Sequence, residues 1–208
     1  MHKNVTAIIP AFNEEARIAD VVSAVAGYVD EVIVINDGSR DETANTALKA
    51  GAKVINFAEN RGYIAALKAG FTEAAADIVV TLDADGEFSP SYIPLLVAPI
   101  LAGEAEMTQG HRSVVPRPSE RLLTWMAGLK RDVGDSGTGL RAIKTELAKS
   151  LEIEGACICG VLSLEVLKRG CRIIDVPIEL KSIDKPRKIA WFHIRQFFIL
   201  LPWLWAKI

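Results

Sequence analysis

The sequence predicts an α/β protein, built as one domain around a mostly parallel central sheet with helices on both faces. Two observations predict this class. The 208 residues are 50% hydrophobic and 24% charged, which is ordinary globular composition and a length suited to one domain. In the first half of the chain, strand-like apolar runs alternate with helical stretches of about 10 to 15 residues, the pattern of parallel β-α-β units.

Five apolar runs in the first half predict strands, because they are short and rich in the β-branched residues that buried strands favour. They cover 5–10, 31–37, 54–57, 77–83 and 107–112. Helical spacing predicts the connections, over 14–28, 39–50, 62–75 and from Ser89 or Ser91 onward. For the second of these helices, Ser39 and Glu42 three positions later predict a capping box.

The second half is less regular. Helices are expected over 119–130, 144–150 and 158–169, a glycine-containing loop (GDSGTG) over 134–139, and a strand over 172–177. The sequence has no evident internal repeat or linker. We therefore expect one domain over 1–182, followed by a basic and aromatic segment over 183–208 that forms a C-terminal amphipathic helix.

Polar side chains follow most of the predicted strands. Ligands of parallel sheets bind beyond the carboxyl ends of the strands, so these side chains should meet at one edge. They are Asn13 and Glu14 after the first strand, Asp37 after the second, Glu59 and Asn60 after the third, Asp83 with Asp85 after the fourth, and Arg112 at the end of the fifth. The sequence therefore predicts a polar ligand site at this edge.

The segment TLDADGEF carries the most informative chemistry. Asp83 and Asp85 stand one residue apart at the end of an apolar strand, and Glu87 follows two residues later. Carboxylates this close repel one another, so a cation is expected to neutralise them. A hard divalent ion takes oxygen ligands of this kind together with the phosphates of a substrate.

Asp37 precedes Gly38 in the segment INDGSRDET and has two possible roles. Its carboxylate can accept hydrogen bonds from a base or from ribose hydroxyls, or it can cap the helix that follows. Both roles stay open at this point.

Several classes of function are disfavoured. No GxGxxG follows the first strand and no GxxxxGK[ST] occurs, which argues against dinucleotide and P-loop sites. A net charge of -2 argues against general nucleic-acid binding. Cys157, Cys159 and Cys171 lack CxxC or zinc-ligand spacing and are expected to be reduced thiols, and the three histidines form no recognisable ligand pattern. The glycines of 134–139 are expected to shape an active-site loop.

A set of motifs occurs in order along the chain. They are PAFNEE at 10–15, NDGSRD at 36–41 with Thr43, NRG at 60–62, DAD at 83–85, GHR at 110–112 and DSGTGLR at 135–141. With these motifs the sequence strongly resembles family 2 glycosyltransferases, over about residues 5 to 180. In particular it resembles the dolichyl-phosphate mannose synthase group, the polyprenyl-phosphate glycosyltransferases. The resemblance implies a Rossmann-like GT-A domain.

The same resemblance assigns roles to single residues. Pro10, Phe12, Glu14 and Asp37 would hold the nucleoside of a sugar nucleotide. The ribose and phosphate region would be lined by Asp83 and Ala84, and Asp85 and Glu87 would hold Mg²⁺ or Mn²⁺. The substrate phosphates would face Arg112, and Asp135, with the loop to Arg141, would border the acceptor. The family often has Gln at the position of Glu87, so the carboxylate here adds negative charge.

One departure concerns the segment 183–188. The family usually has an Arg and a Gly-x-Ser-Lys-like stretch there that grips the pyrophosphate, whereas this sequence reads IDKPRK. Lys185, Arg187 or Lys188 is the candidate replacement.

The resemblance implies a metal-dependent inverting glycosyltransferase that moves a sugar from a nucleoside diphosphate sugar to a polyprenyl phosphate or another acceptor. We expect Asp85, Arg112 and Asp135 to be its catalytic residues. A lipid phosphate is already largely ionised near neutral pH, with a second pKa of about 6, so a strong base is unnecessary. For a hydroxyl acceptor, Asp135 is the candidate base.

Two alternatives stay open. A nucleotidyltransferase would usually carry a Gly-rich, basic loop after the first strand, where PAFNEE is acidic and has no Gly. A domain that binds sugar nucleotides without turnover is compatible with the altered segment 183–188.

The C-terminal segment, together with the lipid-phosphate acceptor that the resemblance implies, predicts peripheral attachment to the cytoplasmic face of a membrane. From residue 181 onward there are six basic residues and one acidic residue, and three of the four tryptophans fall in the last 18 residues. Basic and aromatic residues interleaved on a helix suit the headgroup boundary of a bilayer. No apolar run reaches the roughly 18 to 20 residues of a spanning helix. Membrane contact is expected through 189–208, and ordinary packing of this helix on the domain is the alternative.

Overall fold

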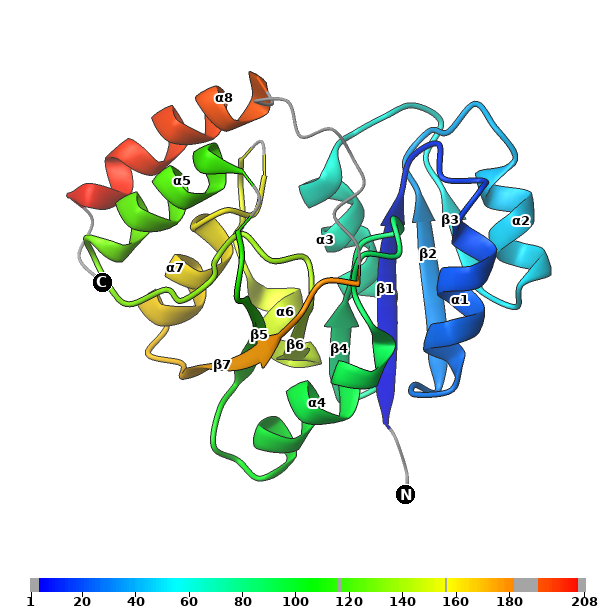
Figure 1. Ribbon diagram of the computed structural model, residues 1–208, viewed down its shortest axis with the longest axis horizontal. Coiled ribbons are helices and arrows are strands. Elements are labelled where there is room, and N and C mark those ends of the chain that lie inside the picture. The colour runs from blue at the N-terminus through cyan, green and yellow to red at the C-terminus, as the bar shows by residue number, and fades with distance from the viewer. Residues whose placement is uncertain (1–3, 116, 156, 182–190, 206–208) are drawn as a thin grey trace.

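The fold is a seven-stranded sheet in the order β3-β2-β1-β4-β6-β5-β7, covered by helices (Figure 1). This computed structural model describes residues 4–115, 117–155, 157–181 and 191–205. The strands are β1 (Val5–Ala11), β2 (Glu31–Asn36), β3 (Lys53–Asn56), β4 (Ile78–Thr81), β5 (Met107–Arg112), β6 (Arg141–Lys144) and β7 (Ile173–Ile178). The helices are α1 (Ile18–Ala26), α2 (Thr43–Lys49), α3 (Tyr63–Glu73), η1 (Pro90–Tyr92), α4 (Ile93–Leu101), α5 (Pro118–Gly128), α6 (Thr145–Ser150), α7 (Val161–Lys168), α8 (Trp191–Leu200) and η2 (Leu201–Leu204).

The prediction of a mostly parallel sheet is confirmed, with one exception. Strand β6 runs antiparallel to both of its neighbours, β4 and β5. Because β6 is antiparallel to both strands, β5 runs in the same direction as β4. The end of β5 at Arg112 therefore reaches the same edge of the sheet. Strand β6 is not predicted by the sequence. Its last residue, Lys144, is expected to begin a helix, but that helix begins at Thr145.

The first helix is shorter than predicted. Residues 14–17 form a turn instead, in which the backbone N–H groups of Arg17 and Ile18 both donate to the carbonyl of Glu14. Helix α1 then begins at Ile18. The turn keeps Glu14 at the sheet edge instead of placing it on a helix.

The predicted capping box at Ser39 and Glu42 is wrong. Glu42 is itself the residue that precedes α2, and no side chain caps that helix. The hydroxyl of Ser39 instead accepts the backbone N–H of Asn13 at 3.0 Å. Ser39 therefore ties the loop after β2 to the loop after β1, which fixes two sides of the ligand edge.

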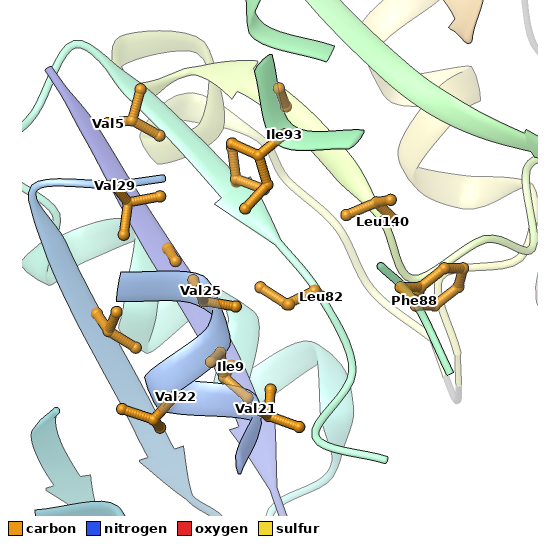
Figure 2. Close-up of a cluster of buried hydrophobic side chains, with 14 of the residues drawn as sticks. Val5, Ile9, Val21, Val22, Val25, Val29, Leu82, Phe88, Ile93 and Leu140 are labelled. Carbon is orange, nitrogen blue, oxygen red and sulfur yellow. The ribbon is translucent and has the colours of Figure 1, made fainter. Parts of the chain in front are cut away.

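Two hydrophobic cores lie on the two faces of the sheet. All seven residues of β1 are buried, as expected for a central parallel strand. In the first core, Val21, Val22 and Val25 of α1 pack toward Ile9 of β1 (Figure 2). The neighbouring Ile8 points to the opposite face and joins the second core, which includes buried residues of α3, α5, α6 and α7.

Helix α8 lies along α5 (Figure 1) and confirms that the chain ends in a helical segment. Leu200 at its end is buried in the second core, while Phe198 is exposed. In the part of the chain that is described, none of the helices combines the length and apolarity needed to cross a membrane.

Candidate active site

A cavity of about 1130 Å³ opens at the carboxyl edge of the sheet. It gathers most of the residues that the sequence placed there: Pro10, Phe12, Glu14, Asp37, Asn60, Asp83, Ala84, Asp85, Glu87 and Arg112. Asn13 and Glu59 are not among its lining residues, and the side-chain carbonyl of Asn13 accepts the N–H of Arg40 at 3.0 Å. The predicted edge site is therefore a single continuous cavity.

The β1 side of the cavity combines an apolar ring with a carboxylate. Phe12 is 46% exposed at the cavity wall, unusual for a large apolar side chain with no structural task. The backbone N–H of Glu14 donates to Thr43 at 2.8 Å, and its carboxylate pairs with Arg17 at 2.9 Å. An exposed aromatic face beside a polar wall is suited to a planar base.

Asp37 does not cap α2. Its buried carboxylate accepts the backbone N–H groups of Arg61 at 2.7 Å and of Gly62 at 2.9 Å. Gly62 is the residue that precedes α3, so Asp37 anchors the start of that helix across the cavity wall. An ionised carboxylate has about four acceptor positions, and two are used here, which leaves capacity for a ligand.

Replacing Asp37 should therefore affect both stability and binding. Asp37→Asn puts an amide donor against one of two backbone donors, so we expect the free energy of unfolding to fall by about 1–3 kcal/mol. We expect weaker nucleoside diphosphate binding in the same variant. Urea unfolding and calorimetric titration would measure the two effects, with Glu104→Gln in the exposed turn after α4 as the control. Unchanged affinity in a destabilised variant would leave Asp37 with an anchoring role only.

The cavity floor carries the paired carboxylates. Asp83 accepts a hydrogen bond from the hydroxyl of Tyr63 at 3.0 Å, and Asp85 accepts the backbone N–H of Glu87 at 3.1 Å. Burial and then the charge of Asp85 raise the pKa of Asp83 to about 6. Two like charges held this close, with a third carboxylate at Glu87 on the same wall, form an oxygen-rich set that fits a hard divalent ion.

Arg112 belongs to a buried ion network. Its guanidinium bonds Asp135 at 2.6 and 2.8 Å and lies 3.2 Å from Glu120 of α5. Burial opposes both charges of the Arg112–Asp135 pair, but the hydrogen bonds and charge of Arg112 hold the pKa of Asp135 below its ordinary value. Asp135 is also absent from the cavity lining. It is therefore placed to orient Arg112, and its low pKa makes it a weak base.

The glycine loop, which the sequence predicted to shape an active-site loop, approaches Asp83 closely. Gly137 and Gly139 line the cavity. A Cβ at Gly139 would lie 2.3 Å from a carboxylate oxygen of Asp83, so this position has no room for a side chain. The loop thus forms one wall of the site by bringing bare backbone against it.

Other lining residues were not identified from the sequence. Tyr63 and Glu120 lie on helices, so the rule that ligand-binding residues follow the strands of a parallel sheet does not predict them. Arg117 and Arg195 add positive charge to the side of the cavity formed by α5 and α8. The segment 183–188, with the candidate cations Lys185, Arg187 and Lys188, lies outside the described residues.

A mostly parallel sheet with an Asp-x-Asp pair on the floor of an edge cavity is the arrangement of a GT-A glycosyltransferase. The family model of Glycosyl transferase family 2 matches residues 6–149. The chain belongs to this family and is a glycosyltransferase. This assignment replaces the nucleotidyltransferase alternative.

Two named relatives use polyprenyl phosphates. The chain is 25% identical to a dolichol-phosphate mannosyltransferase of Pyrococcus furiosus, over 96% of this chain and 64% of the relative. It is 33% identical to an undecaprenyl-phosphate 4-deoxy-4-formamido-L-arabinose transferase of Shewanella sediminis, over 71% of this chain and 50% of the relative. The chain therefore spans only part of each of these enzymes.

A solved structure agrees with the fold. Glucosyl-3-phosphoglycerate synthase from Mycobacterium tuberculosis, crystallised with Mn²⁺, UDP-glucose and phosphoglyceric acid, superposes with a TM-score of 0.73 at 26% identity. The match covers 88% of this chain and 72% of the synthase. This neighbour was crystallised with a divalent metal together with a nucleotide sugar.

Proposed function

We propose that this protein transfers a sugar, with inversion and with a divalent metal ion, from a nucleoside diphosphate sugar to a polyprenyl phosphate. The observation that carries the proposal is the carboxylate pair Asp83 and Asp85 on the floor of the edge cavity. Both transferase relatives named above are polyprenyl-phosphate enzymes, which supports the acceptor class.

The donor occupies the β1–β4 side of the cavity in this proposal. Phe12 offers its exposed ring to the base, and Pro10, Glu14 and Asp37 line the same wall. Asp83 and Ala84 border the ribose and phosphates. Asp85 and Glu87 would hold Mg²⁺ or Mn²⁺, and such an ion neutralises the diphosphate leaving group as the glycosidic bond breaks.

Arg112, Arg117 and Arg195 contribute the positive charge on the acceptor side. Arg112 is fixed in direction by Asp135, so it can meet an anionic oxygen without further ordering. An ionised phosphate acceptor attacks without a general base. The low pKa of Asp135 agrees with such an acceptor better than with a hydroxyl.

A transfer assay tests the proposal. The full chain is incubated with Mn²⁺ and a panel of UDP-, GDP- and dTDP-sugars, with polyprenyl phosphate or phosphoglyceric acid as acceptor. We expect metal-dependent transfer to the lipid phosphate from one class of donor. Transfer to phosphoglyceric acid alone would contradict the lipid acceptor, and nucleotide binding without any transfer would favour a non-catalytic domain.

We further propose that the protein attaches peripherally to the cytoplasmic face of a membrane. Exposed apolar side chains from two neighbouring helices support this, and we call them the α5–α8 apolar surface: Leu122, Trp125, Leu129, Ile194 and Phe198. Trp205, which follows η2, is also exposed. Arg195, exposed beside Ile194, can meet anionic headgroups while the apolar side chains enter the bilayer boundary.

Flotation with anionic liposomes tests the attachment. A chain ending near Lys188 would lack the buried Leu200 and would disturb the core, so point variants are preferable. Trp125→Ser with Phe198→Ser should reduce flotation several-fold, whereas Leu48→Ser, on the exposed face of α2, should not. Equal flotation of both variants and the parent chain, or flotation of none, would leave α8 as an ordinary packed helix.

A further inference from the structure

Three side chains from two segments that are distant in the sequence lie together at the wall of the cavity. Cys157 and Cys159 come from the loop before α7, and His193 comes from α8. All three are buried, with exposed fractions of 8%, 4% and 4%. Their two sulfurs and one imidazole nitrogen lie within 4.8 Å of one another.

The spacing of these atoms suits a small thiophilic cation. A tetrahedral zinc ion with bonds of about 2.3 Å to sulfur and about 2.0 Å to nitrogen needs ligand atoms roughly 3.5 to 3.8 Å apart. Contraction of about 1 Å, within reach of side-chain rotation, brings the three atoms to that distance. Thiolate and imidazole select Zn²⁺ over Mg²⁺ and Mn²⁺, which prefer oxygen.

The surroundings hold these ligands in position. Ser119 of α5 hydrogen-bonds Nδ1 of His193 at 2.7 Å, which makes Nε2 the ring nitrogen suited to ligation. The amide of Gln196 accepts the backbone N–H of Cys157 at 3.1 Å and donates to the carbonyl of Cys159 at 3.2 Å. A hydrogen bond to the second imidazole nitrogen is the usual means by which a protein fixes a metal-binding histidine.

We propose that Cys157, Cys159 and His193 form a zinc site that joins the loop before α7 to helix α8. The three residues all line the active-site cavity, which leaves room on that side for a fourth ligand. This site is separate from the carboxylate site of Asp85 and Glu87, whose ligands are oxygens. Two thiolates balance the charge of the ion, which allows the group to be buried. By fixing α8, the ion orders the helix that carries Arg195 and part of the α5–α8 apolar surface.

Metal binding by the full chain tests the site directly. The purified protein is loaded with Co²⁺ and its near-ultraviolet spectrum recorded, and Zn²⁺ affinity is measured by competition with a chromogenic chelator. We expect a sulfur-to-cobalt charge-transfer band and one tightly held Zn²⁺ per chain. Cys159→Ser and His193→Gln should each weaken Zn²⁺ binding by more than about tenfold. Cys171→Ser, which removes the third cysteine outside the cluster, is the matched control and should bind normally.

Stability gives a second readout. A chelator should lower the melting temperature of the parent chain and of Cys171→Ser but not of Cys159→Ser, because a bound ion stabilises only the folded state that holds it. Asp85→Ala should keep Zn²⁺, so failure of the carboxylate site and failure of this one are distinguishable. Absence of the charge-transfer band in the parent chain would overturn the proposal, even if a variant does not fold. A Cys157–Cys159 disulfide in freshly purified protein, or equal Zn²⁺ retention by Cys159→Ser, would overturn it too.

Discussion

Asp85→Ala should abolish metal-enhanced nucleotide binding and reduce sugar transfer by about a thousandfold. That reduction corresponds to the loss of about 4 kcal/mol of charge stabilisation in the transition state, the scale expected of a metal that neutralises a leaving group. The substitution removes one of the two carboxylates proposed to hold the metal ion, Asp85, and leaves the other, Glu87. Glu87 alone on the same wall cannot replace it, because a hard ion held by protein oxygens needs more than one such ligand.

The fold of this variant should be intact. Burial and then the charge of Asp85 raise the pKa of Asp83 to about 6, so Asp85 opposes the ionised state of its neighbour in the metal-free protein. Its removal relieves that repulsion, and the variant should melt no lower than the parent chain. Thermal-shift measurements with nucleoside diphosphates, with and without Mn²⁺, give both readouts, and Glu104→Ala in the exposed turn after α4 is the control. Mn²⁺-dependent stabilisation equal to that of the parent chain would remove Asp85 from the metal site.

The residues of the site that lie at the ends of strands could be predicted from the sequence. In a parallel sheet, the residue after each strand lies at one edge by geometry alone, so Asp37, Asp83 and Arg112 could be placed together without knowing any contact. The sheet interior was predictable for a similar reason, because runs such as EVIVIN are buried on both faces and need no partner to be recognised.

The rest depends on contacts between distant segments. Strand β6 has four residues and exists because β4 and β5 pair with it on both sides, which local propensity does not show. Ser39 bonds the backbone of Asn13 instead of capping its own helix, so a tertiary contact replaced a local one. The Cys157–Cys159–His193 cluster joins residues more than thirty positions apart, and motif spacing cannot detect it.

The ion network around Arg112 could not be predicted from the sequence either. Arg112 and Asp135 are separated by 23 positions, and Glu120 approaches from α5. The sequence assigned Asp135 to the acceptor, whereas its carboxylate accepts three hydrogen bonds from Arg112, including one from the backbone N–H. We therefore propose that Asp135 is a positioning residue for Arg112.

Breaking this network should have the largest effect on stability. Asp135→Asn keeps the shape of the side chain but removes a buried charge that faces Arg112, and removal of one partner of a buried pair costs about 3–5 kcal/mol. Because Glu120 remains 3.2 Å from the guanidinium, we expect the lower end of that range. Arg112→Met should cost more, since Asp135 loses its paired cation and Glu120 keeps only Arg117, at 3.5 Å. Urea unfolding of both single variants and the double variant measures the coupling between the two residues.

The pH profile of transfer separates positioning from base catalysis. If Asp135 orients Arg112, Asp135→Asn lowers kcat and leaves the acidic limb of the kcat profile where it was, because the group that gives that limb is still present. If Asp135 is the base, the acidic limb disappears with it. The control is Glu165→Gln, which removes another buried carboxylate paired with an arginine, Arg169 at 2.9 Å, away from the cavity. It should lower stability without changing transfer by the folded protein, so a loss of transfer seen only in Asp135→Asn is specific to that site. The acidic limb of the kcat profile then decides between orientation of Arg112 and base catalysis.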